Sequence, residues 1–233
     1  MILPYKEKFE YPTVISESTS DSGRVYYMGS NGIEYDGLYS VTTILSKTSN
    51  TKEIIQQWKD RIGHKNANGI VTNSINKGQW MHDILYYRII GEDYHSKFPN
   101  NYLFQLTSKM ADKIQEYIDR HLSEVWGAEV PVFVPKHYAG RIDCVGVYRN
   151  KQSIVDFKNS YNEKKEEHMY SYKLQCAAYA VAHDYLFNTN IEQAVILICN
   201  SDDISAREII TNGQEFQNFK NEWINIMDSF ING

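Results

Sequence analysis

Two short segments of the sequence combine carboxylates and a lysine in a way that suits metal-assisted hydrolysis. GRID stands at residues 140–143, and VDFK stands at residues 155–158. The composition of VDFK predicts a strand, in which side chains two positions apart leave the same face of the sheet. Asp156 and Lys158 should therefore lie side by side, with Phe157 on the opposite face.

The neighbouring strand brings a second carboxylate close to the first in one register. If a hairpin turns at Arg149 and Asn150, residue 148 pairs with residue 151, and Asp143 lies opposite Asp156. A slip of one residue would move Asp143 to the wrong face of the sheet, so this pairing is one choice among several.

Two carboxylates that face each other in a folded protein need a cation, because like charges repel and uncompensated burial is costly. Mg²⁺ suits this role, since it takes oxygen ligands and usually binds through one or two carboxylates together with water and phosphate. It would generate hydroxide from water and stabilise the charge that grows on a phosphodiester. Lys158 could hold the attacking water and screen the phosphate oxygens. In the alternative interpretation, Asp156 and Lys158 form a surface ion pair on an edge strand.

The composition is that of an ordinary globular chain. Of its 233 residues, 42% are hydrophobic and 23% are charged, which excludes the collagen-like, disordered and mini-protein classes. Its three cysteines are scattered, which excludes a disulfide framework and a CxxC metal site and favours buried thiols in a reducing compartment. We expect no targeting segment at the start of the sequence and no membrane span, since no apolar run approaches about 18 residues.

Charge is distributed unevenly along the chain. The formal net charge is −5, which gives no overall indication of a nucleic-acid partner. Residues 47–77, however, contain six basic and two acidic side chains, whereas residues 201–233 contain two basic and six acidic ones. Solvated helix surfaces are the commoner reason for such runs, so the basic stretch alone does not identify a partner.

Periodicity and turn residues predict a mixed α/β protein. In chain order, the expected elements are a hairpin with its turn at 29–32, helices over 41–45, 52–90 (broken near 66–69) and 102–125, strands over 128–134, 140–148 and 152–158, a helix over 163–187, strands over 194–199 and 205–210, and a helix over 216–230. This order favours a mixed central sheet flanked by helices. We expect one domain over 1–233, with a hairpin region at 1–38, a helical portion at 39–126 and a strand-rich core at 127–233.

Several motifs together resemble the PD-(D/E)XK nucleases of the RecB type. Besides GRID and VDFK, they are YSVTTIL at 39–45, WKDR at 58–61, GQWMH at 78–82 and QCAAY at 175–179. Within that superfamily, the chain resembles the mitochondrial genome maintenance exonuclease family and its phage-encoded relatives, with motif order and spacing preserved over residues 39–187. The resemblance implies a PD-(D/E)XK core at 127–233 and a helical portion that holds DNA.

The resemblance also implies roles for residues at the matching positions. The implied metal ligands are Asp143, Asp156, the Phe157 carbonyl, His82 and, less specifically, Glu129. Lys158 would be the catalytic lysine. The residues that share one face of the 163–187 helix, and would line the site or orient DNA, are Tyr172, Gln175 and Tyr179. Relatives often have an acid four residues after the histidine, whereas Tyr86 stands there in this chain, which leaves the number of metal ions open.

Two of these assignments have ordinary alternatives. On its own, His82 would more often be a helix-surface histidine or a core histidine whose hydrogen bonds are satisfied. Glu129 lies in a predicted strand close to Glu124, and exposed acids on strands are common. The resemblance nevertheless favours His82 and Glu129 as metal ligands.

The resemblance gives the basic residues at 47–77 an expected role in binding DNA. The residues that could form a groove for a single strand, with cations along the phosphates and aromatic rings stacked on bases, are Trp58, Lys59, Arg61, Lys65, Lys77 and Trp80. The two tryptophans could instead pack between helices. The expected activity is that of a Mg²⁺-dependent exonuclease on single-stranded DNA or flaps with free ends, with Mn²⁺ able to substitute. A structure-specific or double-strand endonuclease and a non-catalytic accessory protein that holds single strands are the alternatives.

The expected partners follow from that activity. We expect DNA with a free end, together with replication, recombination or repair proteins, and no membrane. Three cysteines exclude the four-cysteine iron–sulfur subgroup, and no G-x-x-x-x-G-K-[ST] motif indicates a nucleotide cofactor. The expected source is a bacterium, or a phage whose protein acts in the host cytoplasm.

Overall fold

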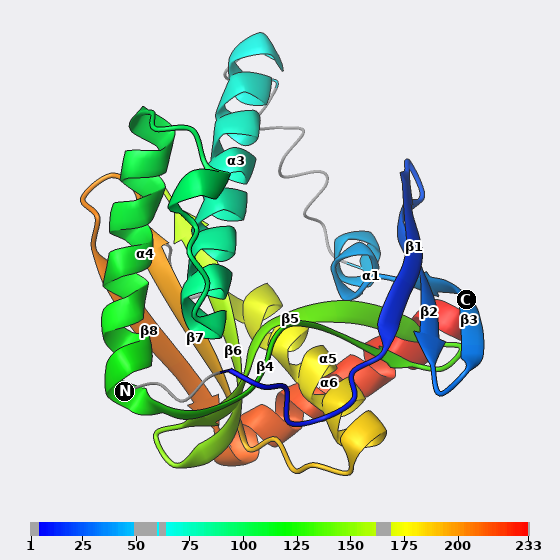
Figure 1. Cartoon of the computed structure of the whole chain (residues 1–233). Helices are drawn as coiled ribbons and strands as arrows, with labels where there is room; N and C mark the ends of the chain where they lie inside the picture. Colours follow the sequence, from blue (N-terminus) through cyan, green and yellow to red (C-terminus); the bar gives the residue numbers. More distant parts are fainter. Residues whose placement is uncertain (1–4, 49–59, 61–63, 162–168, 233) are drawn as a thin grey trace.

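The computed structural model describes residues 5–48, 60, 64–161 and 169–232 (Figure 1). Its helices are α1 Val41–Thr48, α3 His64–Ile90, α4 Tyr102–His121, α5 Tyr170–Phe187 and α6 Gly213–Asn232, with a short 3-10 turn at His95–Lys97. Its strands are β1 Thr13–Ser20, β2 Gly23–Ser30, β3 Ile33–Tyr39, β4 Leu122–Val134, β5 Tyr138–Tyr148, β6 Lys151–Ser160, β7 Gln193–Asn200 and β8 Ala206–Asn212.

A five-stranded sheet forms the centre of the structure. Its order is β4-β5-β6-β7-β8; β6 and β7 run parallel, and the other neighbours run antiparallel. Helices α3 and α4 cover one face of the sheet, and α5 and α6 cover the other (Figure 1). This mixed sheet flanked by helices confirms the fold class that the sequence predicted.

Strand β7 shows why the segment AVILIC is apolar throughout. Ala194 and Ile196 pack in the core beneath α5 and α6, whereas Val195 and Leu197 pack in the core beneath α3 and α4. Every residue of the strand is buried. Because each fully buried large apolar side chain contributes about 1.5–3 kcal/mol, helices on both faces stabilise the middle of the sheet.

Strands β1, β2 and β3 form a second, antiparallel sheet, of which the sequence predicted only β2 and β3. The predicted turn is present, with Asn31 and Gly32 at φ 52° and 75°, as the central residues of a tight hairpin require. Strand β1 escaped prediction because its sequence, TVISESTS, is almost entirely exposed and lacks an alternating apolar face. A bridge between Ser40 and Ala139 joins this small sheet to the central one.

Helix α3 differs from the sequence prediction in being continuous. It runs through residues 66–69, where asparagine and glycine indicated a break. Such residues cost at most about 1 kcal/mol each, and the fully buried side chains of Met81, Ile84 and Leu85 hold the helix against the sheet. The earlier part of the predicted helix, at 52–59 and 61–63, lies outside the described residues.

Helix α4 ends four residues before the predicted position. It stops at His121, because Leu122 already pairs with Tyr148 at the start of β4. The expected helical portion 39–126 therefore includes the beginning of a central strand. The first residues of the helix predicted over 163–187 lie outside the described residues up to position 168. No helix in the described part of the chain has the length and apolar character needed to cross a membrane.

An aromatic cluster fastens the N-terminal segment to the α5 side of the sheet. Phe9 and Tyr11 pack against Phe187, and Trp126 stacks on the buried imidazole of His183 at a centroid distance of 6.3 Å. The segment also runs alongside β4, where the Lys8 N–H donates to the Trp126 carbonyl. The cluster thus covers an edge of the sheet that would otherwise be open.

Hydrogen bonds fix the tautomer of the neutral His183 ring. Thr189 Oγ1 donates to Asp184 Oδ1 at 2.8 Å, so it can only accept from His183 Nδ1–H, which lies 2.8 Å away. The other ring nitrogen, Nε2, accepts from the Tyr11 hydroxyl at 3.2 Å. Burial lowers the pKa of His183 from 6.5 to about 4, because the charged imidazolium would be desolvated.

Acid is therefore expected to destabilise the fold through His183. Below pH 6.5 the unfolded chain binds a proton at this residue, whereas the folded chain does so only near pH 4. The free energy of unfolding should fall by about 3 kcal/mol across that window. Urea unfolding of the wild type and of His183→Gln at pH 6.5 and pH 4 measures this, and the wild type should lose more stability than the variant. Equal losses would contradict the assignment.

Candidate active site

The hairpin between β5 and β6 has the predicted register. Arg149 and Asn150 form its turn with φ values of 48° and 64°, Tyr148 pairs with Lys151, and the ladder is described as far as Cys144 and Val155. One residue beyond this last pair, the two strands carry Asp143 and Asp156. The side chains that the sequence predicted to face each other therefore lie where the described pairing of β5 and β6 ends.

The carboxylate of Asp143 takes a main-chain donor at this fork. The Phe157 N–H donates to Asp143 Oδ2 at 2.7 Å, in place of a carbonyl of β5 that a continued ladder would supply. Burial opposes ionisation of Asp143, but His82, Lys158 and this N–H together hold its pKa below the usual value. Asp143 is thus an oriented carboxylate that is charged at neutral pH.

Glu129 reaches the same place through an irregularity in β4. Its φ is 53°, which costs a non-glycine residue about 1–3 kcal/mol. Ala128 packs beneath α3 and α4 whereas Val130 packs beneath α5 and α6, so the alternation of the strand is broken at Glu129. Burial, with the nearby Asp143 carboxylate, raises the pKa of Glu129 to about 7. A strained backbone thus holds a partly buried acid beside a second carboxylate.

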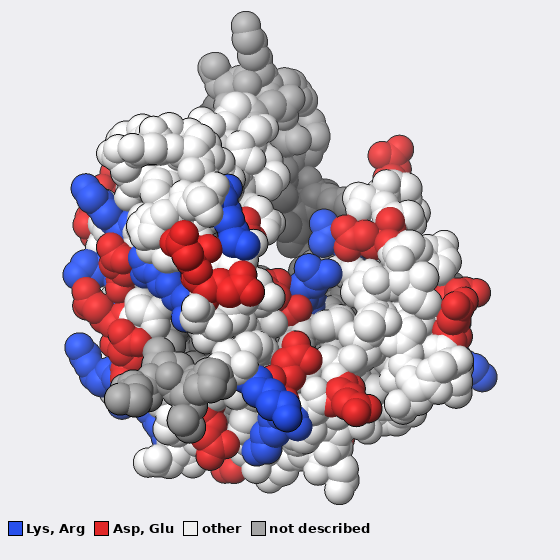
Figure 2. Space-filling model, in the orientation of Figure 1, with Lys and Arg blue, Asp and Glu red and all other residues white. Residues whose placement is uncertain are grey.

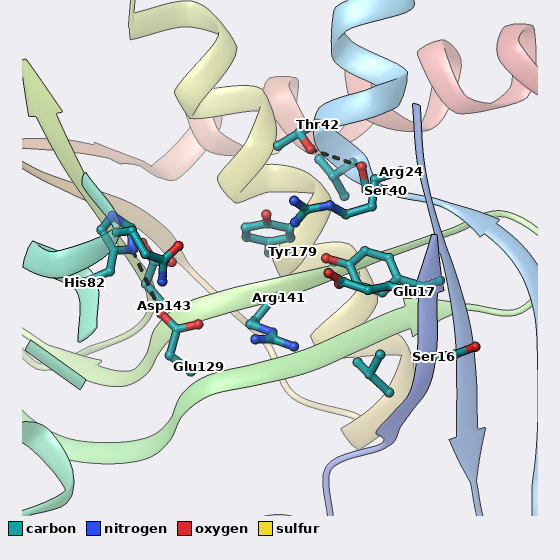
Figure 3. Close-up of a pocket in the computed structure, with 15 residues that line it drawn as sticks. Ser16, Glu17, Arg24, Ser40, Thr42, His82, Glu129, Arg141, Asp143 and Tyr179 are labelled. Carbon is teal, nitrogen blue, oxygen red and sulfur yellow. Dashed lines mark hydrogen bonds and ion pairs between the residues drawn. The ribbon is translucent and has the colours of Figure 1, made fainter. Parts of the chain in front are cut away.

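Helix α3 supplies His82 to these two acids. Its Nδ1 lies 3.4 Å from Asp143 Oδ1 and 3.9 Å from Glu129 Oε1 (Figure 3). One donor atom from each of the three residues fits within 4.8 Å of the others. Although burial disfavours the charged imidazole, Asp143 raises the pKa of His82 to about 9. The group therefore holds a positive charge between two carboxylates, as a bound cation would.

Asp156 and Lys158 form a buried ion pair on the α5 face of β6. Lys158 Nζ lies 2.5 Å from Asp156 Oδ2, and the aspartate side chain is only 2% exposed. Neither Asp156 oxygen receives a well-oriented hydrogen bond within the described residues. Burial raises the pKa of Asp156 to about 6, and despite burial the Asp156 and Asp143 carboxylates raise the pKa of Lys158. These buried oxygens without hydrogen bonds offer ligands to a cation.

Helix α5 carries the predicted residues Tyr172, Gln175 and Tyr179, and the first of these lies next to Lys158. The Tyr172 ring is centred 5.1 Å from Lys158 Nζ, and Gln175 Nε2 donates to the Tyr179 hydroxyl at 2.9 Å. A Cβ added to Gly140 would lie 2.4 Å from the ring of Tyr179. The glycine of GRID is therefore needed because an aromatic side chain of α5 packs directly on β5.

Gly140→Ala tests this close approach. Because the Tyr179 ring is buried against β5, the substitution should force a local shift and destabilise the protein by about 1–3 kcal/mol. It should also displace Asp143, three residues away, and lower catalytic turnover about 10²-fold. Gly69→Ala in α3 is the matched control, because its Cβ meets nothing within 4 Å. That change should preserve turnover and raise stability by up to about 1 kcal/mol. A fully stable and active Gly140→Ala protein would refute the packing argument.

Of the residues proposed from sequence to follow DNA, the two whose side chains the structure describes contact other parts of the protein and do not line the site. Lys77 donates to Ser201 Oγ at 3.0 Å, and Trp80 packs against Phe98 with ring centroids 5.4 Å apart, as the alternative of packing allowed. The positions outside the described residues are Trp58, Lys59, Arg61 and the side chain of Lys65.

Sequence reasoning missed another part of the site. A cleft of about 550 Å³ extends from His82, Glu129 and Asp143 to the small N-terminal sheet. In Figure 2 acidic and basic side chains both surround the hollow in the middle of the face shown. The cationic side chains that line the cleft are Arg24 of β2 and Arg141 of β5. Arg141 stood inside GRID and could have been noticed, whereas nothing in the local sequence marked Arg24.

Comparison with known proteins gives distant relatives. No family model matches the chain. Over 200 residues the chain is 25% identical to mitochondrial genome maintenance exonuclease 1 of Xenopus tropicalis. The alignment covers 79% of this chain and 55% of that protein. Over 189 residues the chain is 24% identical to the Mus musculus protein of the same name, which covers 73% and 52%. The chain therefore spans about half the length of these relatives.

One solved structure provides a further comparison. An Eubacterium rectale protein described as a presumptive exonuclease superposes with a TM-score of 0.46 at 14% sequence identity, over 67% of this chain and 64% of that one. The sequence similarity to the two exonucleases, taken with the five-stranded mixed sheet and the acids beside Lys158, fits a nuclease of the PD-(D/E)XK type.

Proposed function

We propose that this chain is a divalent-metal-dependent exonuclease that hydrolyses phosphodiester bonds in single-stranded DNA or flaps from free ends. The observation that carries the proposal is the meeting of His82, Glu129 and Asp143 within 4.8 Å, at the fork where β6 also presents the buried Asp156–Lys158 pair. Mg²⁺ is the proposed metal, with Mn²⁺ able to substitute.

The donor set supports a hard divalent cation. Asp143 and Glu129 offer carboxylate oxygens and His82 offers a ring nitrogen, all within 4.8 Å of one another. Asp156 and the Phe157 carbonyl are proposed as further oxygen ligands from the family resemblance. Burial raises the pKa of Asp156 and of Glu129, and the nearby Asp143 carboxylate adds to both shifts, so a cation bound here would favour the charged forms of these acids. When bound, the metal would supply Lewis acidity toward the phosphate and a lowered pKa for a bound water.

Lys158 would act on the reacting atoms as a charged donor. Asp156 and Asp143 keep it protonated, so its ammonium can donate hydrogen bonds to an attacking water or to a phosphate oxygen. The Tyr172 ring limits the directions in which the side chain can turn. The Phe157 N–H fixes Asp143, so the Asp143 carboxylate stays next to His82 and Glu129. These residues thus supply orientation and charge stabilisation for phosphodiester hydrolysis.

DNA is the proposed substrate because the two relatives are exonucleases by name and because the site suits a phosphodiester. Single strands with a free end are proposed from the family resemblance and from the basic residues at 47–77. The Gln175–Tyr179 pair would orient the strand. Replication or recombination proteins are the proposed companions, in a bacterial or phage-infected cytoplasm.

One assay separates the proposed activity from its alternatives. End-labelled linear and circular single-stranded DNA are incubated with the protein in Mg²⁺, Mn²⁺ or EDTA, beside Asp156→Ala and Lys158→Ala. The expected result is metal-dependent shortening of linear strands, intact circles and inactive variants. Cleaved circles would indicate an endonuclease, whereas tight binding without cleavage would indicate an accessory protein. Activity that persists in both variants would place catalysis elsewhere.

A further inference from the structure

The cleft that contains the candidate metal ligands has a second wall, formed by the small N-terminal sheet and the start of α1. The residues of that wall are Val14, Ser16, Glu17, Arg24, Tyr26, Ser40, Val41 and Thr42. Figure 3 shows the side chain of Arg24 extending past Ser40 toward Tyr179, across the cleft from His82. One continuous hollow therefore has carboxylates and a histidine at one end and an arginine at the other.

Arg24 is held by its main chain to the first turn of α1. Its N–H donates to Thr43 Oγ1 at 2.9 Å, and its carbonyl accepts from the Ser40 N–H at 2.9 Å. Ser40 also caps the helix as predicted, since its Oγ accepts from the Thr43 N–H at 3.0 Å. The Ser40 hydroxyl donates to Thr43 Oγ1 at 2.8 Å. The motif YSVTTIL thus does more than begin a helix, because its hydroxyls fix the backbone of β2 over the cleft.

The approach of β2 to α1 is close enough to require glycine before Arg24. Gly23 has φ 112°, and a Cβ there would lie 2.2 Å from Thr43 Cγ2. Tyr26, which is buried, lines the same wall of the cleft as Arg24. Arg24 is therefore an exposed cation on a rigid base, which loses less conformational entropy on binding than a surface lysine or arginine on a mobile loop.

Arg141 adds a second guanidinium to the same cleft. It stands two residues before Asp143 on β5 and is exposed. Neither arginine can ligate a cation, and two guanidinium groups beside an acidic centre would repel the metal that the acids attract. Both are instead suited to phosphate, which arginine binds through two parallel hydrogen bonds. The nearby N-terminal end of α1 favours negative charge at the same point.

We propose that Arg24 and Arg141 form a phosphate-binding subsite that holds the single-stranded DNA backbone next to the cleavage point, with Ser40 and Thr43 as positioning residues for Arg24. The inference rests on the proposed function for the identity of the ligand. It places the substrate between α3 and the N-terminal sheet, so that residues 13–39 take part in binding.

Binding is measured apart from cleavage. A fluorescein-labelled oligothymidylate is titrated with protein in EDTA over a range of salt concentrations, and anisotropy gives the Kd. Arg24→Ala and Arg141→Ala should each weaken binding about 10-fold or more and reduce the salt slope by about 0.7. Arg24→Lys and Arg141→Lys should restore the slope but only part of the affinity. Arg120→Ala, which removes an exposed arginine of α4 outside the cleft, is the control and should bind as the wild type does.

Thr43→Val tests the positioning of Arg24. It keeps the shape of the side chain and removes the hydroxyl that holds the Arg24 N–H, so it should weaken binding several-fold. The loss should vanish in an Arg24→Ala background, because the two residues then act through one contact. A purely structural role of Thr43 would give the same loss in both backgrounds.

The outcomes separate this inference from the proposed function. Wild-type affinity and salt slope in both arginine-to-alanine variants would overturn the subsite, even if the protein cleaves DNA in Mg²⁺. Weakened binding in those variants, without cleavage by the wild type, would support the subsite and overturn the nuclease.

Discussion

Replacing Asp143 by asparagine is expected to abolish cleavage, with a loss of about 10³-fold or more. Asparagine keeps the size of the side chain and an oxygen that can accept from the Phe157 N–H, so the fork between β5 and β6 should survive. What is lost is the negative charge that lies 3.4 Å from His82. The variant should therefore fold but bind divalent metal poorly.

Thermal unfolding separates that loss of metal from a loss of structure. A metal at about 100 times its Kd stabilises a protein by about 2.7 kcal/mol, which for a chain of this size raises the Tm by about 5–10 °C. The wild type should show this rise with Mg²⁺ or Mn²⁺, and Asp143→Asn should not. Asp119→Asn is the control, because Asp119 is exposed on α4 and only accepts a hydrogen bond from the Gln115 side chain there. A normal metal-induced rise in Asp143→Asn would remove Asp143 from the ligands.

Lys158→Met should lower cleavage about 10²- to 10³-fold while metal binding persists. Methionine fills much of the space of the lysine stem near Tyr172 but cannot donate a hydrogen bond to water or phosphate. Loss of the Lys158 ammonium also leaves Asp156 buried without its counterion, which should lower the free energy of unfolding of the metal-free protein by about 3–5 kcal/mol. The metal-induced rise in Tm should consequently be at least as large as in the wild type.

Lys173→Met is a close match for that substitution. Lys173 is as exposed as Lys158, at 17% of its side chain, pairs with Glu215 at 2.7 Å, and lies 5.6 Å from the ring centre of Phe219. It stands on α5 and pairs with α6, so its loss should leave cleavage unchanged. Equal loss of cleavage in the two variants would show that Lys158 contributes general stability instead of chemistry.

The sequence predicted the central part of the site because local rules determine it. A two-residue turn at Arg149 and Asn150 sets the register of β5 and β6, and the period of two puts Asp156 and Lys158 on one face. The helix that carries His82 was predicted as well, although only the resemblance to known nucleases drew attention to the histidine itself.

Other features could not be predicted because they depend on contacts between distant segments. Glu129 adopts a backbone conformation that glutamate disfavours, and neighbouring strands maintain it in spite of local preference. Arg24 reaches the cleft only because β2 is bound to α1 through Thr43, nineteen positions later in the chain. The exposed strand β1 has no apolar pattern, so its pairing with β2 left no trace in the sequence.

We propose above all that the acids at the fork of β5 and β6 bind the catalytic divalent metal. Anomalous diffraction from crystals grown with Mn²⁺ tests it most directly, because the ion is located without reference to activity. An anomalous peak is expected within about 2.0–2.2 Å of an Asp143 oxygen, with further ligands from Asp156, Glu129 or His82. Well-ordered side chains at the fork with no peak among them, or a peak bound only elsewhere, would contradict it.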